Sequence, residues 1–379
     1  MTDSRTPFVE LSLGGSRVSG DVVRVEVDDH DRLIDTATVV VDDPHRPYSD
    51  FGREELTLKV DLGWEGEHAV IFEGVITRVT SSSRGDRGRQ VRLVANDLSH
   101  RMKTSSQPPQ DHTGKLSSIL KTIAARSEYQ QIALGEIKID PDPEFSERPL
   151  RQHEESDWQF IQRLAERYRA RAFVEYNEGH SRFYFVSIDE LLSTETVGTL
   201  HFCPGFSELI DFEFQRYAAG AEPLNSATLQ HPTTGEVVSS ADPGPSPEEP
   251  AAAPDPMTVD RLNRLDPALG TRYQAAAAIS EGAPPAAVQR PRRRVAGVGS
   301  DAALAEDVAR QDRTFALGFR GEGTAVGTVK MRAKGKVTIL GVTSWAEGDW
   351  YVRNVKHVFA RSPGDPGHPT FVTKFVVTK

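Results

Sequence analysis

Short runs in which every second residue is apolar, separated by turn residues, fill the first hundred positions of this 379-residue chain. Residues Leu56 to Leu62 alternate strictly, and Val23 to Val27 repeat the spacing. A period of two places the apolar side chains on one face of a β-strand. The strands follow one another without helices between them, whereas an α/β sheet would need such helices. Residues 1–105 are therefore predicted to form a small barrel or sandwich.

Further stretches in this region are also predicted to be β-strands. Residues 36 to 41 form a β-branched run, typical of a buried strand. Residues 70 to 80 and 90 to 95 form a longer strand pair, and the Ser-, Arg- and Gly-rich spacer between them has the composition of an exposed hairpin loop.

The pattern changes near residue 105, where apolar residues begin to recur at helical spacing. Leu116, Ile119, Leu120 and Ile123 fit one face of a helix, with Thr113 as the predicted N-cap.

A second helix follows the capping-box sequence Ser156-Asp157-Trp158-Gln159. Its predicted apolar stripe consists of Trp158, Ile161, Leu164, Ala165 and Tyr168. A strand pair at 172–176 and 182–186 completes a small α+β unit over residues 106–205.

A second β-rich region is predicted over residues 206–379, starting with a strand at 209–214. A Pro- and Ala-rich insert interrupts it at about 232–297, and its part from 241 to 256 is too poor in apolar residues to fold alone. A helix at 301–315, capped by Ser300, precedes strands predicted at 328–331, 336–342, 350–360 and 370–378. The fold class expected is thus mainly β, of α+β type.

Composition limits the partners. The formal charge of −10 argues against nucleic acid as a main partner, and the basic run Arg290 to Arg294 is read as a solvated linker element or a docking arm for an acidic surface. The sequence has neither an apolar run that could cross a membrane nor a secretory signal, so we expect synthesis in the cytoplasm. The single cysteine, Cys203, is expected to be a buried residue at the end of a strand.

No motif predicts catalysis, a cofactor or a metal. Gly321 to Gly327 lacks the spacing and context of a phosphate loop and is predicted to be a hairpin or loop with positive φ. The acidic residues of His153 to Asp157 suit the start of a helix, and Asp140 to Glu144 suits a solvated turn. His357, in mid-strand, is expected to be structural.

Three segments together resemble one family, the phage late control D-type and VgrG-like baseplate hub proteins. Phe72 to Val79 with Val91 to Leu98 resembles the family's FxGxI…D hairpin. Glu155 to Tyr168 resembles its ESDWxFIxRLAE helix, and Tyr351 to His357 with Thr370 to Phe375 resembles its closing strands. The chain departs from the pattern where Arg169 or Ala170 replaces a glycine and where His368-Pro369 replaces an aromatic residue.

The resemblance implies a non-enzymatic hub with two tail-tube-like β-barrels, at 1–105 and 206–379, around the central α+β domain. Three chains would form a ring whose six barrels match a hexameric inner tube, while the other face seats a trimeric spike. Its partners would be a homotrimer, the tube protein, the spike protein and other baseplate proteins, in a phage tail, an extracellular injection device or an intracellular one. The named residues are expected to be core anchors and not active-site groups: Trp158, Ile161, Leu164, Tyr168, Phe72 and Tyr351.

Two other classes of function stay open. One is a tail-associated cell-wall hydrolase or peptidase, which would need a catalytic set that the sequence does not reveal. The other is a carbohydrate-binding module, with Trp345 and Trp350 as a stacking surface.

Overall fold

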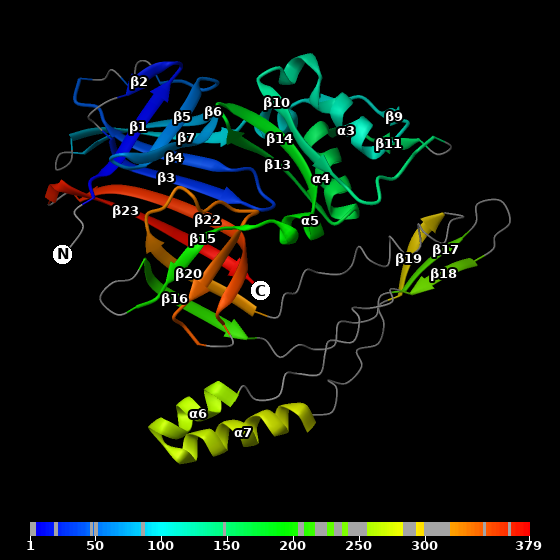
Figure 1. Ribbon diagram of the computed structural model, residues 1–379. Coiled ribbons are helices and arrows are strands. Elements are labelled where there is room, and N and C mark those ends of the chain that lie inside the picture. Colours follow the sequence, from blue (N-terminus) through cyan, green and yellow to red (C-terminus); the bar gives the residue numbers. More distant parts are fainter. Residues whose placement is uncertain are drawn as a thin grey trace. The chain divides into compact units, whose positions relative to one another are not determined.

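The computed structural model shows a mainly β chain in two compact units (Figure 1). It describes residues 5–18, 22–45, 48, 52–84, 88–146, 149–203, 208–216, 226–230, 237–241, 256–282, 293–298, 319–343, 346–362 and 365–379. The first unit contains residues 1–215, 320–342 and 346–379, and the second contains 216–319 with 343–345. The helix predicted at 301–315 lies outside the described residues.

One 13-stranded sheet dominates the first unit. Seven of its strands come from the N-terminal hundred residues: β1 (Pro7–Leu13), β2 (Ser16–Val18), β3 (Val22–His30), β4 (Thr36–Asp42), β5 (Thr57–Trp64), β6 (Glu67–Arg84) and β7 (Gly88–Asp97). Their neighbours run β3-β4-β7-β6-β5-β1-β2, and every pairing is antiparallel. The alternating residues Leu58, Val60 and Leu62 are fully buried, as their period of two predicts.

The other six strands come from the C-terminal part: β15 (Thr196–His201), β16 (Leu209–Arg216), β20 (Phe319–Val326), β21 (Lys336–Leu340), β22 (Gly348–Ser362) and β23 (Asp365–Thr378). They run β16-β20-β23-β22, and β21 joins β22 to β15. The two halves of the sheet meet where β22 pairs with β3, from Asn354–His30 to Ala360–Arg24. Among the described strands this path ends at β2 and at β16, so their pairing closes no barrel.

The central segment forms a smaller α+β body. Its strands are β8 (Ser106–Gln107), β9 (Gln110–His112), β10 (Ile132–Lys138), β11 (Leu150–Gln152), β12 (Glu155–Ser156), β13 (Ala170–Asn177) and β14 (His180–Ser187). Its helices are α2 (Ser99–Thr104), α3 (Leu116–Ala124), the 3-10 helix η1 (Ser127–Tyr129), α4 (Asp157–Arg167) and α5 (Ile188–Ser193). Both the helix α3 and the strand pair β13–β14 were predicted.

Helix α4 forms as its sequence predicts. The Ser156 hydroxyl accepts from the Gln159 amide N–H, and the Gln159 side chain accepts from the Ser156 amide, which completes the capping box. Arg169, one of the two residues compared with the glycine of the resembled pattern, adopts φ +49° just beyond the helix. This left-handed conformation is common just beyond the end of a helix and favours glycine.

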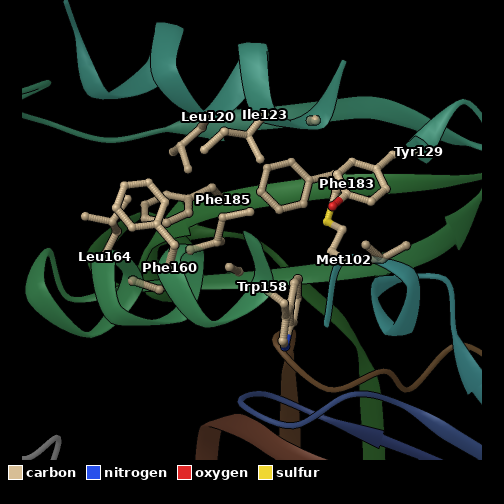
Figure 2. Close-up of a cluster of buried hydrophobic side chains, with 14 of the residues drawn as sticks. Met102, Leu120, Ile123, Tyr129, Trp158, Phe160, Leu164, Phe183 and Phe185 are labelled. Atoms are coloured by element: carbon tan, nitrogen blue, oxygen red, sulfur yellow. The ribbon is translucent and has the colours of Figure 1, made fainter. Parts of the chain in front are cut away.

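Helices α3 and α4 cover the β10-β14-β13 sheet and enclose the core shown in Figure 2. Phe160, Phe183 and Phe185 are fully buried at its centre. Val75 of β6 and Leu98, which precedes α2, belong to the same cluster, so this core continues into the N-terminal half of the large sheet.

Three local predictions are wrong. Val23 is only partly buried because a register shift between Val22 and Arg24 places Val22 inward instead. Thr113 is not the N-cap of α3; Lys115 is, and the Asp142 carboxylate accepts from the Ser117 amide N–H at 3.1 Å. The predicted strand at 328–331 is absent, since β20 ends at Val326.

The glycine-rich segment from Gly321 is itself strand β20, against the prediction of a loop. Aromatic rings explain its glycines. A Cβ on Gly321 would lie 2.5 Å from Phe212 Cζ, and one on Gly323 would lie 2.7 Å from Phe375 Cζ. The glycines thus let rings pack directly on the strand backbone.

The second unit holds most of the predicted insert. Its described parts are a three-stranded sheet of β17 (Ser226–Gln230), β18 (Val237–Ala241) and β19 (Arg293–Val298), and a helical pair of α6 (Pro256–Leu265) and α7 (Pro267–Gly282). The two helices were not predicted. Arg293 and Arg294 of the basic run lie in β19.

Candidate functional site in a buried ionic cluster

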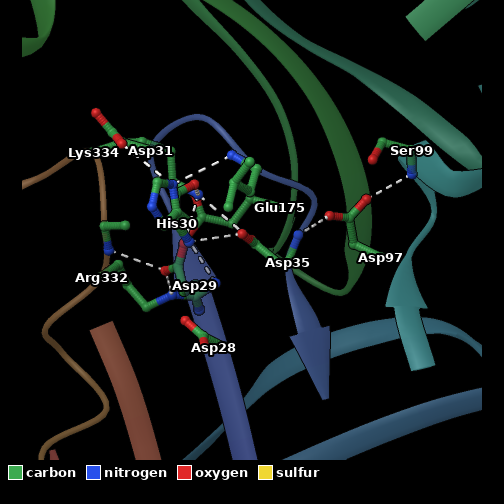
Figure 3. Close-up of polar contacts among 12 residues, drawn as sticks. Asp28, Asp29, His30, Asp31, Asp35, Asp97, Ser99, Glu175, Arg332 and Lys334 are labelled. Carbon is green, nitrogen blue, oxygen red and sulfur yellow. Dashed lines mark hydrogen bonds and ion pairs between the residues drawn. The ribbon is translucent and has the colours of Figure 1, made fainter. Parts of the chain in front are cut away.

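Three regions of the first unit, namely the N-terminal strands, the central α+β body and the C-terminal strands, each contribute charged side chains to one buried cluster (Figure 3). We define the ionic cluster as eight residues: Asp29, Asp31, Asp35, Asp97, Arg171, Glu175, Arg332 and Lys334. The aspartates stand at the ends of β3 and β7 and in the β3–β4 turn, Arg171 and Glu175 lie on β13, and Arg332 and Lys334 precede β21. Charged groups are rarely buried unless they are paired, and here each region supplies part of the pairing.

Lys334 is the central cation, with its side chain 2% exposed. Its Nζ lies 2.6 Å from Asp29 Oδ1 and 3.5 Å from Asp35 Oδ2, and it stands 4.8 Å from the centre of the Phe173 ring. The backbone at Lys334 has φ +69°, and its amide N–H donates to the carbonyl oxygen of Val352. Burial alone would lower the pKa of the ammonium, but Asp29 and Asp35 raise that pKa above its usual value.

Asp29 receives donors from two cations and from the backbone. Arg332 Nε lies 3.0 Å from Asp29 Oδ2, and the Ala333 amide N–H donates to the same oxygen at 3.0 Å. Arg332 also reaches Glu175 Oε1 of β13 at 2.8 Å. Burial opposes ionisation of Asp29, yet Lys334 and Arg332 outweigh it and hold the pKa of this carboxyl well below its usual range.

Asp35 and Asp97 show the opposite behaviour because fewer positive charges face them. Burial raises the pKa of Asp35 well above its usual value, and the nearby Asp29 and Asp97 add to this effect. Burial also raises the pKa of Asp97 to about 6, although the Ser99 amide N–H donates to it at 2.7 Å. The Asp35 amide N–H donates to Asp97 Oδ2 at 2.7 Å, which ties β7 to the β3–β4 turn.

A second pair extends the cluster toward β13. Arg171 Nε donates to Asp31 Oδ2 at 3.2 Å, and both side chains are buried. Together the pairs connect the N-terminal strands, the central α+β body and the C-terminal strands. The arrangement joins three regions at one place, and every carboxylate of the cluster has at least one ion-pair or backbone-donor partner. Among the described residues, no group of three or more His, Cys, Asp or Glu could hold a metal ion.

The predicted core anchors lie in separate places and form no single site. Trp158, Ile161 and Leu164 are buried in the central core, and Tyr168 packs against it while partly exposed. Phe72 is buried in the core of the N-terminal strands. Tyr351 is 3% exposed on β22, and burial raises its pKa above the usual value.

One more buried acid, outside the ionic cluster, was not recognised from the sequence. Asp157 was interpreted as a residue favoured by the helix dipole, yet it is fully buried. It accepts from Arg126 Nη1 at 2.6 and 2.8 Å, from the Tyr129 hydroxyl at 2.7 Å and from Gln152 Nε2 at 2.9 Å. Only the folded core brings these partners together, so no local pattern in the sequence predicts them.

Several other candidates are corrected or placed by the structure. Cys203 is exposed, not buried, because β15 ends at His201 before reaching it. Trp350 is fully buried and cannot offer a stacking surface to a carbohydrate, and Trp345 lies outside the described residues. His357 is buried, with its Nδ1 3.2 Å from Thr373 Oγ1, and burial lowers its pKa to about 4. It is therefore a neutral structural residue at neutral pH.

No protein-family model matches the chain, and no curated protein matches its sequence. Solved structures do match its fold. A tail protein of Neisseria meningitidis MC58 has a TM-score of 0.63 at 14% identity, covering 99% of this chain and 97% of that one. The 43 kDa tail protein of prophage MuSo2 from Shewanella oneidensis has a TM-score of 0.62 at 10% identity, covering 99% and 98%.

A third match comes from a secretion apparatus. The c3393 protein of E. coli, a type VI secretion component described as similar to the T4 phage tail proteins gp27 and gp5, has a TM-score of 0.52 at 12% identity. The match covers 97% of this chain and 76% of that protein. At these identities the likeness establishes the fold alone: this chain has the fold of tail proteins of phages and of type VI secretion.

Proposed function

We propose that this chain is the structural baseplate hub of a contractile phage tail or a phage-like contractile injection system. One observation carries the proposal: the fold matches tail proteins over 97% or more of their own length and of this chain. The motifs in three segments of the sequence, which resemble those of hub proteins, support the proposal independently. Both support a structural role over an enzymatic one.

We further propose the domain division 1–105, 106–205 and 206–379, with the two outer regions as tube-like β-barrels. The large sheet supports this division, because seven of its strands lie in residues 1–105, five lie in 206–379, and β3–β22 is the join. The remaining strand, β15, comes from the end of the central segment and pairs with β21. Three chains would then present six similar β units to a hexameric inner tube. A closed ring of this kind has heterologous, self-limiting interfaces.

In this proposal the ionic cluster keeps the two outer regions at a fixed angle to the central body. A symmetry adaptor needs such rigidity, since both of its β units must sit on the same ring. Breaking a buried ion pair leaves an uncompensated charge and is strongly unfavourable. The cluster therefore suits a junction at which the two outer regions must keep a fixed orientation to the central body.

Co-purification tests the function. The tagged chain, expressed in its native host, should recover the inner tube protein, the spike protein and other baseplate proteins in one particle. A Lys334→Met variant, in which the ionic cluster is broken, should recover less of the tube, spike and baseplate proteins than the native chain. Recovery of no tail component with the native chain would contradict the proposal. Lysis of purified cell walls by the chain, measured as loss of turbidity, would favour the hydrolase instead.

A further inference from the structure

A cavity of about 390 Å³ opens on the face of the large sheet that points away from the Asp29 carboxylate. From Val25 onward the buried residues of β3 are Val25, Val27 and Asp29, so Asp28 and His30 face the other side. These two residues line the cavity together with Leu33 of the β3–β4 turn, Arg320 of β20, and Arg353 and Asn354 of β22.

Arg353 is placed there by a β-bulge. In the pairing of β22 with β23, Val352 faces Val377 and Asn354 faces Val376, which leaves Arg353 as the extra residue. A bulge redirects a side chain out of the normal alternation. The Asp31 amide N–H donates to the Arg353 carbonyl oxygen at 2.8 Å and fixes this backbone. Within the described part of the chain, the half-buried Arg353 guanidinium has no hydrogen bond and no ion pair.

The other charges in the cavity wall leave this positive charge uncompensated. Asp28 is already paired, with Lys356 Nζ at 2.9 Å and with Asn354 Nδ2 at 2.6 Å. His30 Nδ1 lies 3.0 Å from the Arg32 amide nitrogen and 3.3 Å from Asp31 Oδ1, and an imidazole carries no negative charge that could pair with Arg353. Among the residues that the structure describes, the Arg320 side chain pairs with Glu322 alone; the two side chains are 50% and 59% exposed, and such surface pairs contribute little.

An apolar edge stands next to these arginines. Leu33 is 66% exposed at the tip of the β3–β4 turn, whereas Asp31 and Asp35 on either side are buried in the ionic cluster. The turn is therefore anchored at both ends while its leucine points to solvent. An exposed apolar side chain on a fixed turn, beside an unpaired guanidinium, is an ordered binding surface and needs little reorganisation to accept a ligand.

We propose that this cavity, the Arg353 pocket, binds an acidic peptide segment of a partner protein. A carboxylate of the segment pairs with Arg353 and with Arg320, and a neighbouring apolar side chain covers Leu33. Guanidinium groups bind carboxylates through paired N–H donors. The proposal goes beyond the hub function, because the pocket lies within one chain and binding can be measured in any state of assembly.

A nucleic acid fits the pocket less well. Phosphate backbones are bound along extended cationic tracks, with bases stacked on aromatic rings. The Arg353 pocket is a single cavity with the Asp28 carboxylate and aliphatic residues in its wall, on a chain of formal charge −10. A short peptide with alternating acidic and aliphatic residues matches both its charge and its apolar edge.

The test measures fluorescence anisotropy of the full chain with fluorescein-labelled probes. The probes are an acidic peptide (Glu-Leu-Glu-Ile-Glu, with blocked ends), its basic counterpart with Lys in place of Glu, and a single-stranded oligonucleotide. The variants are Arg353→Gln, Arg353→Lys and Leu33→Ser. Arg92→Gln is the matched control, since Arg92 is an exposed arginine of β7 outside the pocket. Circular dichroism melting confirms that each variant folds.

We expect the acidic peptide to bind and the basic peptide not to bind. Arg353→Gln and Leu33→Ser should each weaken binding about tenfold or more, Arg353→Lys should retain part of it, and Arg92→Gln should leave it unchanged. The proposal is overturned if the acidic peptide does not bind at concentrations up to about 1 mM. Equal binding by folded Arg353→Gln, or tighter binding of the oligonucleotide at the same residues, would overturn it as well.

Discussion

Lys334 Nζ lies 2.6 Å from Asp29 Oδ1, which joins two residues that stand 305 positions apart in the sequence. The contact links the last strands of the chain to its first strands, and Phe173 of the central body lies beneath the same ammonium. One buried cation thus touches all three regions that the proposed hub must hold together.

Lys334→Met tests this contact. The variant leaves Asp29 buried with only Arg332 as a charged partner, so we expect a loss of about 3–5 kcal/mol in the free energy of unfolding, measured by urea denaturation. Adding Asp29→Asn should recover part of the loss. Lys356→Met is the control, because its pair with Asp28 is more than a third exposed and should be worth less than about 1 kcal/mol. Equal effects of the two lysine variants would contradict the account.

Trp158→Ala tests the central core. The indole is 6% exposed among the packed residues of helix α4 and the β10-β14-β13 sheet, so its removal opens a cavity. We expect a loss of about 3–5 kcal/mol in thermal or urea unfolding. Leu134→Ala, at a side chain that is 46% exposed on β10, should change stability by less than about 0.5 kcal/mol. Unchanged stability in the tryptophan variant would refute its place in the core.

Gly321→Ala tests the close approach of an aromatic ring to β20. The new Cβ would lie 2.5 Å from Phe212 Cζ, so the ring or the strand must shift, and we expect a cost of about 1–3 kcal/mol. Gly198→Ala on β15 has no atom within 4 Å of the new Cβ and should be tolerated. The melting temperatures of both variants are compared with that of the native chain. A lower value for Gly321→Ala alone would show that ring packing requires the glycine, and equal values for the two variants would contradict this.

Asp97 predicts a distinctive pH dependence. Its pKa is raised from 3.8 to about 6 in the folded chain, so its protonated form is favoured by folding. Its contribution to stability is fully present below pH 3.8 and is lost as the pH rises through about 6. Asp29 has a lowered pKa, and its contribution is instead present above pH 3.8 and lost as the pH falls further.

The Asp97→Asn variant separates these two effects. Its free energy of unfolding should improve relative to the native chain as the pH rises from about 4 to about 7, by up to about 3 kcal/mol. NMR titration of the Asp97 carboxyl carbon should show a midpoint near 6. A midpoint below 4, or a difference between the two proteins that does not change with pH, would show that burial does not govern this group.

Local sequence signals predicted the local structure well. The capping box at Ser156 and the stripe from Trp158 to Leu164 contain the information for helix α4, and strict alternation contains that for β5. Strand β20 was mistaken for a loop because its glycines are required by the close packing of Phe212 and Phe375, which lie far away in the sequence. Helices α6 and α7 were missed because Pro and Ala dominate their surroundings.

The candidate site could not be predicted from the sequence, because its residues also lie far apart along the chain. Asp29 and Asp35 look like ordinary strand-end and turn residues, and Lys334 looks like a surface lysine. Only the pairing of β22 with β3 brings them together, and no local pattern specifies a pairing between strands more than 300 residues apart. The unpaired Arg353 likewise depends on a bulge that forms only within the assembled sheet.

Native mass spectrometry of the full chain, followed by electron microscopy of the same sample, tests the proposed hub most directly. We predict a species of three copies, seen as rings with three-fold symmetry on one face and six similar β units on the other. A chain that stays monomeric at every concentration, and that forms no ring when the tube and spike proteins are added, would contradict it.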